Sequence, residues 1–191
     1  MPSIKGTQTE KNLLAAFAGE SQARNRYTFF AAVARKEGYE QIAWVFEDTA
    51  SNEKEHAEMF FKQLEGGDVE ITAAYPAGVI GETDANLAAA AAGEHLEWST
   101  LYKDSAATAK EEGFNRIAAV FTEISEVEEQ LEARYLRLMD NVRNGRVFER
   151  DTVVKWRCRN CGYVHEGKSA PKVCPACQHP QAYYELKAEN Y

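Results

Sequence analysis

The chain has 191 residues, enough for one helical bundle with a sizeable core and one small additional module. Its formal net charge of −8 argues against a nucleic-acid-binding protein, which would show a basic surface, and against attraction to anionic lipid. No apolar run approaches the roughly 20 residues of a membrane-spanning helix, and residues 1–9 lack the apolar core of a signal peptide. We therefore expect a cytoplasmic protein with no nucleic-acid partner and no membrane partner.

Two helices are predicted in the first third of the chain. Helical spacing of apolar residues covers residues 7–37, where Thr7 and Glu10 form a capping box and Gly38 is a stop signal. A second helix is expected over residues 39–65, before two consecutive glycines. These helices would form an antiparallel hairpin.

A long crossover is predicted next, over residues 68–83, because proline and glycine are scattered among mostly apolar residues. Asp84 is expected to cap a third helix over residues 84–113, and a fourth helix is expected over 114–144. Helices of about 27 residues would be about 40 Å long at 1.5 Å per residue. Such lengths and one long crossover indicate a four-helix bundle.

The two predicted hairpins form an imperfect internal repeat. Residues 36–46 recur 75 residues later as residues 111–121, which indicates one helical hairpin present twice. At this offset His56 aligns with Leu131. The other aligned pairs are Glu53 with Glu128, Tyr27 with Tyr102 and, one residue out of step, Glu20 with Glu94.

Five acidic residues interrupt the apolar faces of these helices: Glu20, Glu53, Glu94, Glu97 and Glu128. Buried carboxylates without Lys or Arg partners are costly, and bound cations are the simplest compensation. With His56 three residues after Glu53, the set follows the Glu and Glu-x-x-His pattern of di-iron bundles. The alternative is that these acids are exposed on helices with a different inward face. Tyr27 and Tyr102 are placed to donate hydrogen bonds to the acids, and the alternative is that they are plain core tyrosines. We expect His95, His165 and His179 not to be ligands.

The last segment carries two Cys-x-x-Cys pairs between predicted strands at residues 153–156 and 183–186. Four thiolates with this spacing can enclose one tetrahedral iron or zinc ion, and the alternative to an iron site is a structural zinc ribbon. A module of fewer than about fifty residues would depend on this metal for stability. The four predicted ligands are Cys158, Cys161, Cys174 and Cys177.

The acid pattern followed by two cysteine pairs resembles the rubrerythrin family over essentially the whole chain. The resemblance implies a mainly α protein, with a ferritin-like four-helix bundle over residues 1–147 and a small rubredoxin-like β metal domain over residues 148–191. It implies a di-iron centre on Glu20, Glu53, His56, Glu94, Glu97 and Glu128, and one iron on the four cysteines.

The same resemblance implies an enzyme, a peroxidase that reduces hydrogen peroxide to water in oxidative-stress defence. Its electrons would pass through the rubredoxin-like iron from a reductase or a rubredoxin that draws on NADH. Glu97 and His56 would be catalytic, because they would exchange at one iron as it changes oxidation state. A homodimer that passes electrons between chains is also implied.

Leu131 departs from this family pattern, which places a histidine there. Leucine cannot coordinate, so either water or Glu132 fills the position or that metal binds weakly. A second hypothesis is therefore an iron-binding or electron-transfer protein with an incomplete di-metal site. A third is a zinc-stabilised interaction module on an inert bundle.

Overall fold

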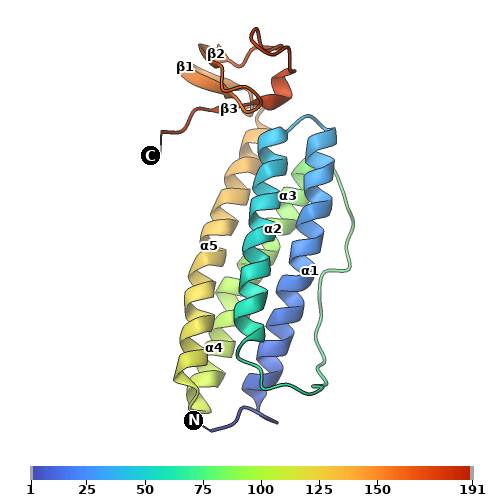
Figure 1. Cartoon of the computed structure of the whole chain (residues 1–191), viewed down its shortest axis with the longest axis vertical. Coiled ribbons are helices and arrows are strands. Elements are labelled where there is room, and N and C mark those ends of the chain that lie inside the picture. The colour runs from blue at the N-terminus through green and yellow to red at the C-terminus, as the bar shows by residue number, and fades with distance from the viewer. Residues whose placement is uncertain (1, 190–191) are drawn as a thin grey trace.

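The computed structural model describes residues 2–189 and shows a helical bundle with a small β module at one end (Figure 1). The first hairpin consists of α1 (Gln8–Lys36) and α2 (Glu40–Phe61). Residues 62–82 then return along the outside of α1 without regular structure (Figure 1). The second hairpin consists of α3 (Thr83–Leu96), the π-helix η1 (Glu97–Leu101) and α4 (Tyr102–Glu111), followed by α5 (Asn115–Arg143). The expected fold class, mainly α with a four-helix bundle, is confirmed. None of the described helices is long and apolar enough to cross a membrane.

The helix ends differ from expectation in two places. Thr7 caps α1 as predicted, since its hydroxyl accepts a hydrogen bond from the Glu10 N–H at 3.2 Å. The second bond of the predicted capping box is not formed, because the Glu10 carboxylate accepts from the Gly6 N–H instead of the Thr7 N–H. The second helix ends at Phe61, however, and not at residue 65. The third helix begins one residue early, so Asp84 lies in its first turn and pairs with Arg143 at 2.7 Å instead of capping. The cap position is Glu82, which makes no side-chain capping bond.

The π-helix η1 explains why the internal repeat runs one residue out of step. Glu20 aligns with Glu94 at an offset of 74 residues, whereas Tyr27 aligns with Tyr102 at 75. The additional residue lies between Glu94 and Tyr102, where η1 replaces α-helical geometry. As a result Tyr102 is buried, and Leu101, which straight helical spacing would place inward, is exposed.

Two apolar clusters fill the bundle, one on each side of the acidic residues. The first lies toward the β module and includes Tyr27, Phe46 and Tyr135. The second lies toward the other end and includes Leu13, Phe60 and Phe121. The bundle therefore has apolar cores that do not depend on the acidic layer between them.

The C-terminal module is a three-stranded antiparallel sheet in the order β2-β1-β3. The strands are β1 (Glu149–Cys158), β2 (Val164–Ser169) and β3 (Tyr184–Leu186), with the 3₁₀-helix η2 (Gln181–Tyr183) before β3. Strand β2 was not expected, because its sequence is polar; it forms by pairing with β1, where Trp156 lies opposite His165. The module packs on the end of the bundle through the stacked rings of Tyr39 and Phe148, with centroids 6.1 Å apart.

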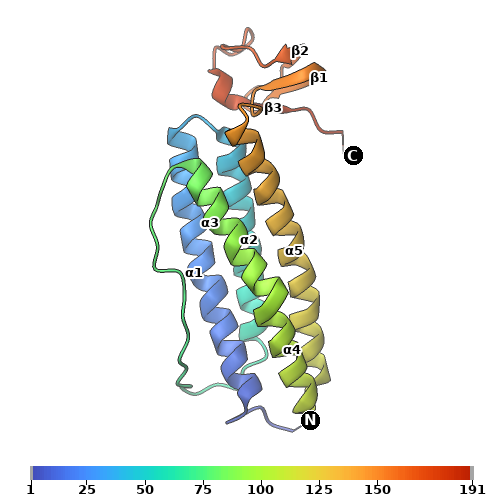
Figure 2. The ribbon, with the colours of Figure 1, turned by 180° about the vertical axis from the view of Figure 1, so that it is seen from behind.

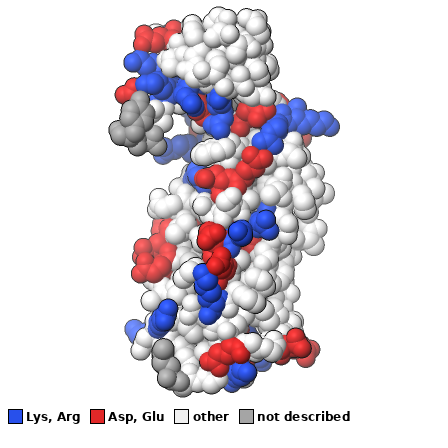
Figure 3. Space-filling view, in the orientation of Figure 1, with Lys and Arg blue, Asp and Glu red and all other residues white. Residues whose placement is uncertain are grey.

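Charged side chains of both signs alternate along the face of the bundle shown in Figure 3. The net charge of the chain is −8, but this face shows no single large acidic patch.

Candidate metal centres

Four predicted ligands converge in the middle of the bundle. Glu20 of α1, Glu53 and His56 of α2, and Glu128 of α5 each offer one donor atom, and these atoms lie within 4.8 Å of one another. The three carboxylates are fully buried, and His56 is 9% exposed. The helical spacing places these side chains inward, so the alternative of exposed acids is wrong for these residues.

His56 is the centre of this group. Its Nδ1 lies 3.0 Å from Oε2 of Glu53 and 3.8 Å from Oε1 of Glu20. It also lies 2.9 Å from Oε1 of Glu128, in ion-pair contact but without the alignment of a hydrogen bond. One imidazole therefore faces three carboxylates.

Glu94 and Glu97 lie on the second hairpin and differ from each other. Glu94 is fully buried. Glu97, the first residue of η1, is half-buried and lines a cavity that opens toward solvent. Among the five acids of the cluster, Glu97 is thus the one in contact with the outside.

Two buried tyrosines each donate a hydrogen bond to a carboxylate of the other helical hairpin. Tyr27 of α1 donates a 2.5 Å hydrogen bond to Glu94 of α3, and Tyr102 of α4 donates one of 2.5 Å to Glu20 of α1. The expectation that these tyrosines support the acids is confirmed. Each tyrosine leaves the second oxygen of its carboxylate without a partner.

Burial shifts the pKa values of these acids upward. It raises the pKa of Glu53 and of Glu97 to about 7, and that of Glu128 to about 8. The pKa values of Glu20 and Glu94 are also raised well above their usual range, by burial first and by the charge of Glu53 second. Without a cation, the protein therefore disfavours the charged form of the whole cluster.

The unpartnered oxygens fit bound cations. Glu20 Oε2, Glu53 Oε1, Glu94 Oε2 and both oxygens of Glu128 are buried without a hydrogen bond in the described structure. No Lys or Arg in the described chain comes within 4.0 Å of them. Carboxylate oxygens with one imidazole are ligands that suit iron or manganese. The donor set is therefore that of a di-iron-type centre.

The position of Leu131 remains without a coordinating group. Leu131 is buried, one turn after Glu128. Glu132 cannot replace the missing histidine in this arrangement, because its carboxylate accepts a 2.5 Å hydrogen bond from Trp98 Nε1 and lies 3.1 Å from His95 Nδ1. His95 accordingly faces Glu132 and not the cluster. The suggestion that Glu132 fills this position is wrong, which leaves water or a weakly bound metal.

The four cysteines form the second centre. Their sulfurs lie within 4.8 Å of one another, with Cys158 and Cys177 at 3.8 Å and Cys161 and Cys174 at 3.7 Å. A tetrahedral ion with metal–sulfur bonds near 2.3 Å requires sulfur separations of roughly 3.8 Å. All four thiols are free, and the His179 backbone N–H lowers the pKa of the Cys177 thiol to about 6. This geometry fits one tetrahedral metal.

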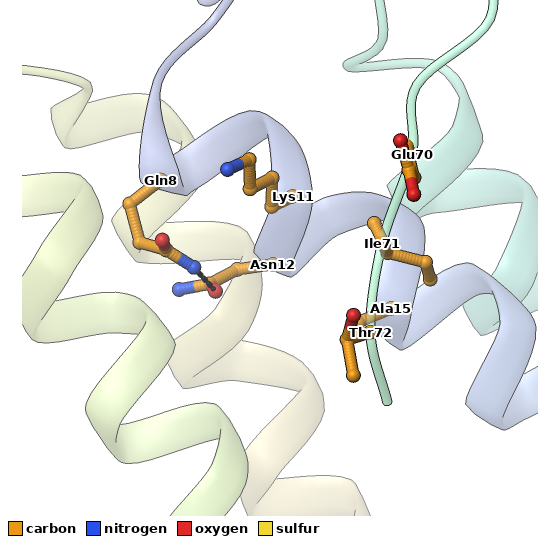
Figure 4. Close-up of a pocket in the computed structure, with 7 residues that line it drawn as sticks. All are labelled: Gln8, Lys11, Asn12, Ala15, Glu70, Ile71 and Thr72. Atoms are coloured by element: carbon orange, nitrogen blue, oxygen red, sulfur yellow. Dashed lines mark hydrogen bonds between the residues drawn. The ribbon is translucent and has the colours of Figure 1, made fainter. Parts of the chain in front are cut away.

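Three cavities among the described residues lie between α1 and the crossover, and two of them share Asn12 and Ala15 in their lining. One, of about 550 Å³, is lined by polar side chains such as Gln8, Lys11 and Glu70 and does not include the acids of the cluster (Figure 4). The other, of about 440 Å³, continues from it past Asn12 and Ala15 and reaches Glu97. The second cavity is therefore the one that connects the cluster with solvent.

Family comparisons agree with both centres. The family model "Rubrerythrin" matches residues 11–139, and the model "Rubrerythrin, rubredoxin-like domain" matches residues 156–185. A rubrerythrin of Porphyromonas gingivalis is 64% identical over 189 residues, which cover 99% of this chain and 94% of that protein. A rubrerythrin of Nitratidesulfovibrio vulgaris is 56% identical over the full length of both chains.

Solved structures show the same architecture. Partially reduced nigerythrin is 33% identical with a TM-score of 0.64, covering 97% of this chain and 92% of that one. Symerythrin from Cyanophora paradoxa, 21% identical with a TM-score of 0.63, covers 74% of this chain and 89% of that one, and it shares the fold.

Proposed function

The chain belongs to the rubrerythrin family, and from this premise we propose that it is a non-haem di-iron peroxidase that reduces hydrogen peroxide to water in oxidative-stress defence. The observation that carries the proposal is the buried cluster of acids and His56, whose unpartnered oxygens fit bound cations. Bound iron would supply the electrons that break the O–O bond.

The protein residues have separate tasks in this proposal. Glu20, Glu53, His56, Glu94, Glu97 and Glu128 hold the metal ions. Tyr27 and Tyr102 fix the orientation of two carboxylates. The apolar clusters on both sides exclude water from the two ends of the cluster, and the cavity beside Glu97 gives access from the side. Glu97 and His56 are the proposed catalytic residues, since one contacts the cavity and the other is the nitrogen donor, and we expect both to change partners during turnover.

Electrons enter, in this proposal, through one iron on the four cysteines. Their donor would be a reductase or a rubredoxin that draws on NADH. The β module packs against the Tyr39 end of the bundle, about 24 Å along α1 from Glu20 at 1.5 Å per residue. This separation supports a homodimer in which the cysteine iron of one chain serves the cluster of its partner. A reducing cytoplasm would suit the free thiols.

The test begins with the iron and zinc content of anaerobically prepared protein, where about three irons per chain are expected. The reduced protein is then mixed with hydrogen peroxide, and oxidation is followed through the thiolate-to-iron absorption. Rapid oxidation with water as product supports the peroxidase. A colourless zinc protein that peroxide leaves unchanged would contradict it.

A second candidate is an iron-binding or electron-transfer protein without turnover. It is favoured by Leu131, which is buried and offers no donor, and by the engagement of Glu132 with Trp98. This candidate predicts one or two irons per chain and slow oxidation by peroxide.

A further inference from the structure

The cavity beside Glu97 is larger than hydrogen peroxide needs. Its volume of about 440 Å³ is many times the roughly 30 Å³ that one water molecule occupies in the liquid. Its lining residues come from α1, from the crossover and from the continuous segment of α3, η1 and α4. Figure 2 shows the course of these elements along the bundle. Volumes of this size are typical of sites for organic ligands.

The walls of this cavity are mainly apolar. Ala16 on α1, Tyr75 on the crossover and Leu96 and Leu101 on either side of Glu97 all face it. The two leucines are 51% and 46% exposed. The Tyr75 hydroxyl donates a 2.6 Å hydrogen bond to the Ala15 carbonyl, which fixes the ring over α1. An apolar wall next to a redox centre favours a substrate with a hydrocarbon portion.

The inner end of the cavity reaches the metal cluster. Its lining includes Glu97 and Tyr102, and the Tyr102 hydroxyl bonds to Glu20. Gly19 also lines this end, and a Cβ there would lie 3.6 Å from the Tyr75 ring and 3.9 Å from the Glu97 carboxylate. A side chain longer than methyl at residue 19 would occupy the passage between crossover and acid.

We propose that this cavity binds the hydrocarbon portion of organic hydroperoxides and that the chain reduces them at the same cluster. The inference rests on the proposed peroxidase function. In the reaction ROOH takes two electrons and two protons, the O–O bond breaks, and one alcohol and one water leave. The two electrons would come from the reduced irons of the bundle. The iron on the four cysteines would then reduce these irons again, one electron at a time.

The experiment compares cumene hydroperoxide with hydrogen peroxide on the reduced, iron-loaded chain, with cumyl alcohol measured as product. In Gly19→Leu, we expect the ratio of the two rate constants, organic over hydrogen peroxide, to fall by at least about 10-fold, the range that pocket volume alone can discriminate. Leu101→Gln, at an exposed position, should lower the ratio less and does not depend on packing in the bundle. Ala18→Leu adds the same side chain one residue away, outside the cavity, and should leave the ratio unchanged.

A binding measurement completes the test without turnover. Cumyl alcohol should show saturation transfer from the wild-type protein in solution, and this signal should disappear in Gly19→Leu. Turnover of hydrogen peroxide without turnover of the organic substrate would overturn the inference and leave the proposed function intact. Turnover of neither would refute both, whereas equal turnover in wild type and in both cavity variants would show that the cavity is not the binding site.

Discussion

The acid cluster and the cysteine site are both metal centres, but they depend on the fold in opposite ways. The cluster gathers residues more than one hundred positions apart, from Glu20 to Glu128, and apolar cores on both sides hold its helices. The cysteine site uses two short knuckles, and its buried core is small: Trp156, Cys158, Ala170, Cys174 and Tyr184. In the bundle the fold builds the site, whereas in the β module the metal is expected to hold the fold together.

This difference teaches where buried charge is tolerated. The bundle holds five acids whose charged forms burial disfavours, between two apolar clusters that do not depend on them. The β module has only a small apolar core, and its four cysteine ligands lie in two local turns. Gly162 and Gln178 follow the two knuckles with φ of 81° and 62°.

The largest expected effect is the loss of the β module when metal is removed. Chelation should unfold residues 149–186 and leave α1 to α5 folded, because a structural thiolate site supplies roughly 10–16 kcal/mol of apparent folding free energy. Hydrogen exchange measured by mass spectrometry should show fast exchange in the module alone, reversed when iron or zinc is restored. If the module stays protected from hydrogen exchange in the presence of chelator, the metal does not hold it folded.

The second effect is a pH-dependent stability of the metal-free bundle. Glu53, Glu97 and Glu128 keep their protons up to pH 7–8 in the folded state, whereas the unfolded chain releases them near 4.5. Their stabilising contribution is therefore complete below about pH 4.5 and is lost as pH rises through 7–8. A pKa raised from 4.5 to about 7 corresponds to roughly 3 kcal/mol.

Thermal unfolding of the metal-free protein should thus occur at a lower temperature at pH 8 than at pH 5, and iron should remove most of this difference. Glu128→Gln, which removes one of these titrating groups, should be less sensitive to pH. An equal melting temperature at both pH values would show that the acids are not buried as described.

The third effect concerns the unequal halves of the cluster. Leu131→His adds a nitrogen donor one turn after Glu128 and should raise the iron content toward three ions per chain if the wild-type chain holds only one or two. Ala133→His, at an exposed position on the same helix, is the matched control. Iron content and peroxide turnover that stay at the wild-type level in Leu131→His would mean that Leu131 does not limit the site.

The smallest effect should come from the supporting tyrosines. Tyr102→Phe removes a hydrogen bond to the charged Glu20, worth about 1.5 kcal/mol, and should weaken metal binding about 10-fold in competition with a chelator. Tyr135→Phe is the control, because this buried hydroxyl bonds to no carboxylate among the described residues. Similar affinities in the two variants would argue against a supporting role for Tyr102.

Periodicity and repetition were enough to predict the helices, the crossover and the convergence of Glu20, Glu53, His56 and Glu128. They succeeded because each ligand interrupts an apolar face at regular spacing. They failed at Leu101, since the π-helix shifts all later residues by one position. The signal was present in the change of repeat offset between Glu94 and Tyr102, but only the structure locates the additional residue.

Other differences arise from contacts distant in sequence. Strand β2 has little apolar alternation and is determined by its neighbour β1. Asp84 has the chemistry of a cap but pairs with Arg143, 59 residues away. Glu132 lies one residue after Leu131, yet Trp98 and His95 hold it away from the cluster. The boundary between residues 147 and 148 remains a prediction.

The hydrogen bonds from Tyr27 and Tyr102 make the two hairpins interdependent. Because α1 supplies the hydroxyl that orients Glu94, and α4 supplies the one that orients Glu20, neither hairpin carries the complete support of its own ligand. A chain cleaved in the crossover should therefore bind iron at the acid cluster only when both fragments are mixed. The two hairpins therefore share a repeated sequence, but they act as complementary parts of one metal site and not as two independent units.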